Sequence, residues 1–274
     1  MSGRLLVVDF DFFFPNPHTA GDTTEASWAL FDWGQQENLL FRELIWPHRA
    51  ALLDAWGVPL PRCEGYGGFW DRFEFTTSTL FVADSNSYAA QPPLHDPDEV
   101  FDEVVLFDAH HDAGYHPDRG FDAFREGRFE ADCGEWTLEH HRLGSAIRMF
   151  YPPWRHRWAQ LEPAPAIPVV RATDPGGPMG TFDAVFACRS GCWVPPWCDD
   201  QWAELLLDFK QTVPGGRVVT VDPDLRPRWG HDQEHERATQ HEVLAATTST
   251  RFRATRPPGA GRGAGIVAAD EGAA

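Results

Sequence analysis

Lysine is almost absent from this chain, because Lys210 is the only one and arginine supplies the rest of its 23 basic residues. The basic residues are outnumbered by 41 acidic ones, which leaves a formal net charge of −18. A nucleic-acid partner needs a basic surface for its phosphates, so this balance argues against one. The same balance is compatible with a cationic substrate.

Long apolar runs are also missing. No stretch approaches the ~18 uncharged apolar residues that cross a bilayer, and the apolar segment Leu5–Phe14 carries Asp9 and Asp11. We therefore expect no membrane partner. The five cysteines are odd in number and follow no signal-peptide-like segment, which predicts free thiols and a cytoplasmic location. The three that lie closest together lack the CxxC spacing of a zinc site: Cys188, Cys192 and Cys198.

Apolar strands alternate with helical patterns along most of the chain, and 42% of its residues are hydrophobic. This alternation predicts an α/β fold with three α/β/α layers and a mostly parallel sheet. We expect one domain over residues 1–226 and an extension over 227–274, of which the Gly/Ala/Pro-rich part 257–274 is predicted to be disordered. The expected strands are Leu5–Phe10, Thr79–Ala83, Val104–Asp108, Ile167–Val170, Ala184–Ala187 and Arg217–Val221; the expected helices are Gln36–Trp56, Trp136–Phe150 and Asp199–Gln211.

The most informative segment is the strand Val104–Asp108 with the residues that follow it, Ala109-His110-His111-Asp112. On an extended backbone, residues i, i+2 and i+4 point to the same side. Asp108, His110 and Asp112 should therefore converge at the carboxyl end of a strand, where open α/β sheets bind their ligands. Two carboxylates and an imidazole suit a divalent metal such as Mn²⁺, Fe²⁺ or Zn²⁺.

A second acidic pair follows the first strand of the chain. Asp9 and Asp11 have the same i, i+2 spacing, and if they share a site with the first cluster, the carboxylates repel one another unless cations lie between them. The economical interpretation is one site that holds two metals. Asp222 and Asp224 form a competing pair, but the proline between them is more typical of a turn.

The segment 108–112 resembles the Asp-Ala-His-x-Asp motif of the arginase/ureohydrolase superfamily, and Val8-Asp9-Phe10-Asp11 resembles its Asp-x-Asp motif. The aromatic run through Phe13 is most similar to the peptide arginases of ribosomal-peptide biosynthesis, and Asp132–Trp136 is similar to a further segment of that family. The resemblance covers residues 1–15 and about 80–140. It implies an arginase-like fold, two Mn²⁺ ions and, because the Asp-x-Asp motif comes first here, a circular permutation.

The chain departs from the family at one expected ligand. The superfamily supplies a further histidine to one metal from a loop to which residues 81–88 are comparable, and here Asn86 stands at that position. An amide oxygen binds transition metals more weakly than an imidazole does. The resemblance therefore implies either a loose or harder-ion position at Asn86, or recruitment of Asp84 in its place.

Hydrolysis at such a centre needs residues for the proton and for the substrate. The leaving amine requires a general acid, for which the histidines near the motif are candidates: His111, His116, His140 and His141. Glu135 is a candidate to pair a guanidinium through both oxygens, and Trp136, Trp193 or Trp197 to flank its plane. Each residue also has a structural interpretation, since a Glu in the first turn of a helix favours the helix dipole and most Trp residues lie in cores.

These observations predict a Mn²⁺-dependent hydrolase of guanidine C–N bonds, with Fe²⁺ or Zn²⁺ as other possible metals. The predicted substrate is the Arg side chain of a ribosomal precursor peptide, which would yield ornithine and urea. Three alternatives stay open: a small-molecule amidinohydrolase or related C–N hydrolase, a haloacid-dehalogenase-like phosphatase with Asp9 as nucleophile, and a relative that binds metal or peptide without turnover.

Overall fold

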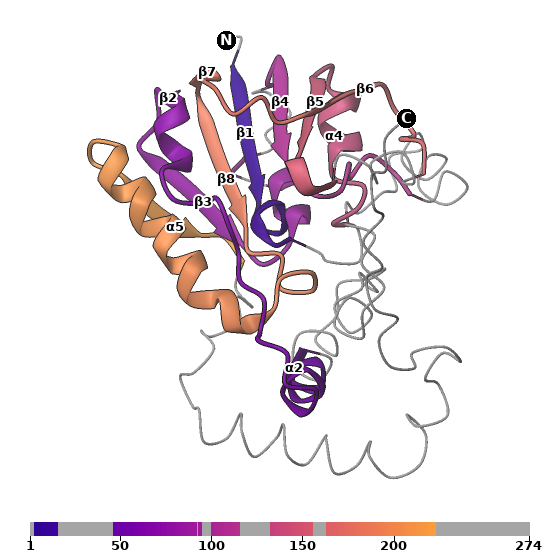
Figure 1. The fold of residues 1–274 in the computed structure, drawn as a ribbon. Helices are drawn as coiled ribbons and strands as arrows, with labels where there is room; N and C mark the ends of the chain where they lie inside the picture. Colours follow the sequence, from indigo (N-terminus) through magenta and orange to yellow (C-terminus); the bar gives the residue numbers. More distant parts are fainter. Residues whose placement is uncertain are drawn as a thin grey trace, which may run out of the picture.

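Seven parallel strands form the central sheet of the protein in a computed structural model (Figure 1). The structure describes residues 3–15, 46–91, 93–94, 100–115, 132–155 and 163–222. The strand order is β6-β5-β4-β1-β8-β3-β9, and every pair in it is parallel. The predicted α/β class is therefore confirmed, while the predicted extension over 227–274 lies outside the described residues.

The elements of the sheet and its helices follow the chain in this order. The strands are β1 (Arg4–Asp9), β2 (Phe73–Phe75), β3 (Thr79–Ala83), β4 (Glu103–Phe107), β5 (Ala146–Tyr151), β6 (Val169–Thr173), β7 (Gly180–Phe182), β8 (Ala184–Cys188) and β9 (Arg217–Thr220). The α-helices are α2 (Trp46–Ala55), α4 (Thr137–Arg142) and α5 (Asp199–Thr212). Short 3₁₀ helices include η1 (Phe10–Phe13), η4 (Phe69–Arg72) and η5 (Asn86–Ala90). β2 pairs with β7 in a separate parallel ribbon.

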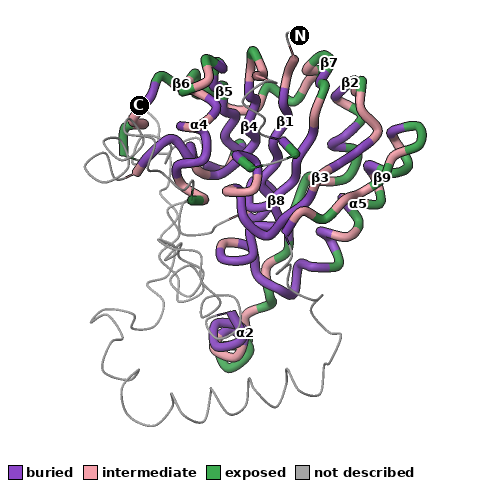
Figure 2. Tube along the Cα trace, turned by 180° about the vertical axis from the view of Figure 1, so that it is seen from behind, coloured by how far each residue is buried: buried purple, intermediate pink, exposed green. Residues whose placement is uncertain are grey.

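The central strands of the sheet, β4, β1, β8 and β3, are buried on both faces, as is typical of parallel sheets (Figure 2). Along β1 the side chains alternate, so Leu6 and Val8 join the core that contains α5, while Leu5 and Val7 join the core that contains α4. This alternation explains why β1 is a continuous apolar run. It also gives the three α/β/α layers expected from the sequence. No helix in the described part of the chain is long and apolar enough to cross a membrane.

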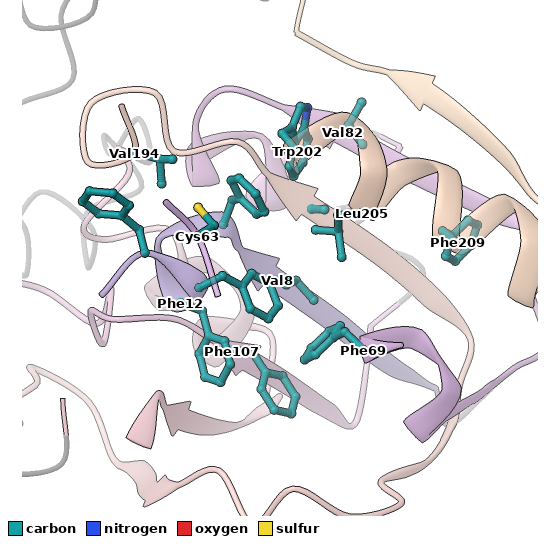
Figure 3. Packing of buried hydrophobic residues seen from close by; sticks show 14 of the residues in the cluster. Val8, Phe12, Cys63, Phe69, Val82, Phe107, Val194, Trp202, Leu205 and Phe209 are labelled. Atoms are coloured by element: carbon teal, nitrogen blue, oxygen red, sulfur yellow. The ribbon is translucent and has the colours of Figure 1, made fainter. Parts of the chain in front are cut away.

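Aromatic rings fill the core on the α5 side (Figure 3). Phe107 lies among the rings of Phe12, Phe69 and Phe73 at centroid distances of 5.5, 5.3 and 5.7 Å, each in an edge-to-face arrangement. Because Phe107 and Phe12 immediately adjoin the two acidic motifs, this packing fixes the backbone from which those motifs project.

An acidic face of α5 fastens the segment 62–71 to the protein. Asp200, Glu204 and Asp208 follow one another at i, i+4 spacing and contact, in turn, the Arg62 guanidinium, the Tyr66 hydroxyl and the Gly68 amide. The 3₁₀ helix η4 lies at the end of this segment, and β2 follows it.

One predicted helix needs correction. The helix expected over Trp136–Phe150 ends at Arg142, and the following residues form β5, whose buried Ile147 and Met149 alternate with exposed positions. The helix expected over Gln36–Trp56 is described only from Trp46 onward, where α2 runs to Ala55 and contains Pro47. The earlier part of that prediction, 36–45, lies outside the described residues.

Candidate metal centre

The strands β4, β1 and β3 deliver acidic or amide side chains to the carboxyl edge of the sheet, with β8 between β1 and β3 (Figure 1). Asp9 ends β1, and Asp11 follows in η1. Asp108 directly follows β4, which pairs with β1, and Asn86 lies in η5 after β3. Parallel strands end at one edge, so segments far apart in sequence meet there.

The first set of converging ligand atoms comprises Asp11, Asp108 and His110, and we call it the histidine group. Its three ligand atoms lie within 4.8 Å of one another. His110 Nδ1 is 2.8 Å from Asp11 Oδ2 and 3.6 Å from Asp108 Oδ1. Backbone amides hold both carboxylates in place, since Ala109 N donates to Asp11 Oδ1 at 3.0 Å and His110 N donates to Asp108 Oδ1 at 2.7 Å.

The second set comprises Asn86, Asp9, Asp108 and Asp112, and we call it the asparagine group. Asn86 Nδ2 lies 2.7 Å from Asp9 Oδ2, 2.9 Å from Asp112 Oδ2 and 3.1 Å from Asp108 Oδ2. An amide nitrogen carries two hydrogens, so it cannot satisfy three carboxylates fully. Asn86 Oδ1 is buried and has no hydrogen-bond partner among the described residues.

These contacts fit a cation in the asparagine group. The orientation of an Asn amide is inferred from its surroundings, because oxygen and nitrogen have nearly the same shape. Turned by half a rotation, Asn86 would present its unpartnered oxygen to the three carboxylates, and four oxygens that face one another need a positive ion between them. Asp108 belongs to both groups, through Oδ1 in one and Oδ2 in the other, which is the arrangement of a bridging carboxylate.

The raised pKa values of the clustered carboxylates also fit a bound cation. Burial, and next the charge of Asp11, raise the pKa of Asp9 and of Asp108 well above the usual range. Burial likewise raises the pKa of Asp112 to about 7, although His110 and the hydrogen bonds from Trp136 and Asn86 oppose that shift. Carboxylates held in this way favour either protons or metal cations as neighbours.

Asp112 is held in an unusual backbone conformation. Its φ is +46°, in the left-handed region that non-glycine residues rarely adopt. Thr137 Oγ1 donates to its carbonyl oxygen at 2.5 Å, and Trp136 Nε1 donates to its Oδ2 at 2.9 Å. Trp136 is fully buried, so its ring has no open face for a substrate, and its place beside Asp112 argues against the predicted substrate contact.

The histidines predicted as general acids differ in their surroundings. His111 is buried and stacks on Tyr115 at 4.3 Å, while its Nδ1 accepts from Ala113 N and its Nε2 lies 2.9 Å from the Pro163 carbonyl oxygen. Both ring nitrogens of His111 are thus engaged by backbone, which gives it a structural part rather than a catalytic one.

The remaining histidines predicted as general acids differ in burial and contacts. His140 Nε2 lies 2.8 Å from the Ala89 carbonyl oxygen, in the core beneath α4. His141 is partly exposed, and its side chain forms no hydrogen bond or ion pair with the described residues. His116 lies outside them. Of the named candidates that can be placed, His141 alone has a partly exposed ring.

Glu135 is buried without a hydrogen-bond or ion-pair partner for its carboxylate among the described residues. Burial, with a smaller contribution from the charge of Asp132, raises its pKa to about 7. Glu135 adjoins Trp136, which contacts Asp112, so it lies in the segment next to the asparagine group. A carboxylate in this setting is suited to a cationic ligand.

Asp84 is not available as the substitute metal ligand that the sequence suggested. Its two carboxylate oxygens accept from Arg189 Nε at 2.6 Å and Arg189 Nη2 at 2.7 Å, and both side chains are buried. Asp222, from the competing acidic pair, accepts from the Asp84 backbone amide at 3.2 Å and so lies beside β3 rather than in the cluster. Asp224 lies outside the described residues.

The loop after β8 borders the centre. Ser190 has a φ of +58°, and its buried hydroxyl lies near Asp9, whose pKa it lowers slightly without a well-formed hydrogen bond. Trp193 lies beside His110 at a centroid distance of 5.7 Å. Trp197 instead packs in the core against Trp46. The Cys-Arg-Ser-Gly-Cys-Trp sequence after a strand was the available signal for this loop.

The cysteines in the described residues are all free, and four of them are buried. Within the described residues, only the histidine group brings three His, Cys, Asp or Glu ligand atoms within 4.8 Å of one another, and none of the cysteines belongs to it. A zinc site at Cys188, Cys192 and Cys198, which the spacing disfavoured, therefore has no structural support.

Comparison with protein-family models, with curated proteins and with solved structures finds no match to this chain. The resemblance to the arginase/ureohydrolase superfamily consequently depends on its motif residues alone. What the structure adds is the placement of those residues in one cluster at the carboxyl edge of a parallel sheet.

Proposed function

We propose that this protein is a dinuclear-metal hydrolase of guanidine C–N bonds, and that its substrate is the Arg side chain of a peptide. One observation supports this most strongly: Asp108 joins the histidine group to the asparagine group, so six side chains form one cluster, which would hold the two ions. Oxygen donors with a single imidazole favour Mn²⁺, with Fe²⁺ or Zn²⁺ as other possibilities.

The proposed reaction adds water to the guanidinium carbon and breaks its bond to the nitrogen of the Arg side chain. Two bound metals supply a water of lowered pKa as the nucleophile near neutral pH. The side-chain nitrogen leaves as an amine once it gains a proton, which gives ornithine, and the remaining fragment is urea. The atoms balance with water as the only co-reactant.

Two residues of the chain are proposed to handle the substrate and the proton. Glu135 would bind the guanidinium through its carboxylate, because it is buried, has no other described partner and would ionise beside a cation. His141 is the proposed donor of the proton to the leaving amine, because its ring is partly exposed and free of other described contacts. The net charge of −18 would favour approach of an Arg-bearing peptide.

The phosphatase alternative has less support. Asp9, the nucleophile in that scheme, is surrounded by Asn86 and further carboxylates, which would repel a phosphate. Arg189 is already paired with Asp84, and Lys210 lies on α5. The binding-only alternative makes the opposite prediction from ours, namely bound metal without any product.

The test is to incubate the protein, loaded separately with Mn²⁺, Fe²⁺ or Zn²⁺, with Arg-containing peptides, free arginine and agmatine. We expect urea, and a peptide mass reduced by one cyanamide unit for each converted Arg, while free arginine turns over little. An Asp9→Asn variant is the control and should release no urea. Hydrolysis of free arginine or agmatine alone would move the assignment to a small-molecule amidinohydrolase. Bound metal without product from any guanidine substrate would contradict the proposal.

A further inference from the structure

The two metal positions of the proposed centre differ in their donor atoms. The histidine group offers one imidazole nitrogen beside its carboxylates. The asparagine group offers the carboxylates of Asp9, Asp108 and Asp112 and the amide of Asn86, so its donors are all oxygen. Nitrogen donors favour Zn²⁺ and related transition metals, whereas carboxylate and carbonyl oxygens suit Mg²⁺ and Mn²⁺.

We propose that the asparagine group is a selective position for a hard divalent cation, Mg²⁺ or Mn²⁺, and that it discriminates against Zn²⁺, while the histidine group accepts Zn²⁺. This inference rests on the proposed metal centre but not on the proposed reaction. It assigns the selectivity to one side chain, Asn86, whose unpartnered oxygen is the donor that the cation would gain.

Among the described residues, the contacts of the histidines and the tryptophan near Asn86 leave no nitrogen donor to take its place. Of the neighbouring histidines, His140 contacts the Ala89 carbonyl oxygen, and His111 is engaged by backbone at both ring nitrogens. The indole nitrogen of Trp136 carries a hydrogen, so it donates to Asp112 and cannot bind a metal. The position therefore keeps its oxygen character.

The backbone also holds Asn86 in place. The Ser85 hydroxyl accepts from the Ser87 amide at the start of η5, and Asp84 is anchored by its buried ion pair with Arg189. Because the residues on both sides of Asn86 are held, its side-chain amide faces the carboxylates without a rearrangement of the loop. Because the loop is rigid, the amide of Asn86 stays among the ligands, and the site favours an ion that suits this fixed set of oxygen donors.

The experiment loads metal-free protein with Zn²⁺ alone, with Mg²⁺ alone, and with both, and then removes unbound ions and measures each metal per chain by elemental analysis. We expect one Zn²⁺ per chain from zinc alone, and one Zn²⁺ with one Mg²⁺ from the mixture. Titration calorimetry should show that the second Zn²⁺ binds at least about tenfold more weakly than the first. Loss of a residue that only orients a metal ligand already weakens metal binding by about this factor.

Two variants of one side chain isolate the cause. Asn86→His should raise bound Zn²⁺ to two per chain, because it introduces an imidazole. Asn86→Asp keeps an oxygen donor and should leave the preference for Mg²⁺ unchanged. Circular dichroism checks that each variant is folded, and His110→Asn gives the reciprocal case, in which Zn²⁺ is lost first.

The outcomes separate this inference from the proposed function. Two equally tight Zn²⁺ ions in the natural chain, with no Mg²⁺ taken up from the mixture, would overturn the inference and leave the dinuclear centre intact. Binding of no metal at all would overturn both. The expected mixed occupancy would support the inference even if no guanidine substrate were hydrolysed.

Discussion

Glu135 is a buried acid whose pKa, about 7, makes its contribution to stability depend on pH near neutrality. Its folded-state pKa lies above the value of 4.5 for an unperturbed Glu, so the folded protein binds the proton more tightly than the unfolded chain does. The stability that this proton gives is therefore lost as the pH rises from the unfolded value through the folded one.

Glu135→Gln should remove this dependence. At about pH 8 we expect the variant to be more stable than the natural chain by on the order of 1–2 kcal/mol, and at about pH 5 the difference should be small. Thermal unfolding at the two pH values measures it. Asp132→Asn is the control, because it removes the charge next in importance to burial and should shift the transition only slightly. An equal effect of Glu135→Gln at both pH values would show that the carboxyl does not titrate there.

Trp136 contacts the candidate metal centre through Asp112, one of its proposed ligands. Trp136→Phe keeps most of the ring but removes the hydrogen bond from Nε1 to Asp112 Oδ2. We expect Mn²⁺ affinity to fall by about 10- to 100-fold, as for other contacts that orient a metal ligand. Calorimetric titration with Mn²⁺ measures the change.

The matched control for that substitution is Trp70→Phe. Trp70 is equally buried, and its Nε1 donates to the Leu205 carbonyl oxygen, in the core beside α5. This variant should lose stability but keep its Mn²⁺ affinity. A similar loss of affinity in both variants would mean that the Trp136 effect is a general consequence of weakened packing.

In the loop after β8, the backbone at Gly191 lies close to the Asp84 carboxylate. A Cβ at Gly191 would lie 2.9 Å from Asp84 Oδ1, which already accepts from Arg189. Gly191→Ala should therefore displace the buried Asp84–Arg189 pair and cost about 3 kcal/mol or more, since a broken buried ion pair leaves uncompensated charge. Denaturant unfolding should show this loss. Gly67→Ala is the control because its Cβ would meet nothing within 4 Å, and equal stability of the two variants would contradict the argument.

Strand patterns were easier to predict from the sequence than the exact ends of helices. The strands β1, β3, β4 and β8 are apolar runs, and the prediction placed each of them. β5 was missed because its alternating apolar residues continue the spacing of the preceding helix across Gly144, and only pairing with β4 decides between the two. The ribbon of β2 and β7 is too short to carry a pattern of its own.

The candidate site was predictable to a similar degree. Spacing predicted that Asp108, His110 and Asp112 converge after this strand. They do lie in one cluster, but not on an extended backbone, because β4 ends at Phe107 and Asp112 has a φ of +46°. The contacts of Trp136 and of the Asp84–Arg189 pair could not be predicted, because each joins segments whose proximity is a result of the tertiary fold. Nor does any local pattern give a non-glycine residue the positive φ found at Asp112.

Across the whole molecule, the order of the strands explains how two motifs about one hundred residues apart in sequence meet. β1 occupies the middle of the sheet between β4 and β8, although it is the first strand of the chain. This central place is compatible with the permutation that the resemblance implies. It also puts Asp9 between the strand that carries Asp108 and the loop that carries Asn86.

The account as a whole depends on Asp108 being shared by the two metal-binding groups. Elemental analysis of protein loaded with Mn²⁺ and freed of unbound ions tests this directly, by comparing the natural chain with Asp108→Asn and with Asp54→Asn, a control at an exposed acid. We predict two Mn²⁺ per chain in the natural protein and in the control, and a loss from both positions in Asp108→Asn. Unchanged stoichiometry in Asp108→Asn would contradict the shared centre.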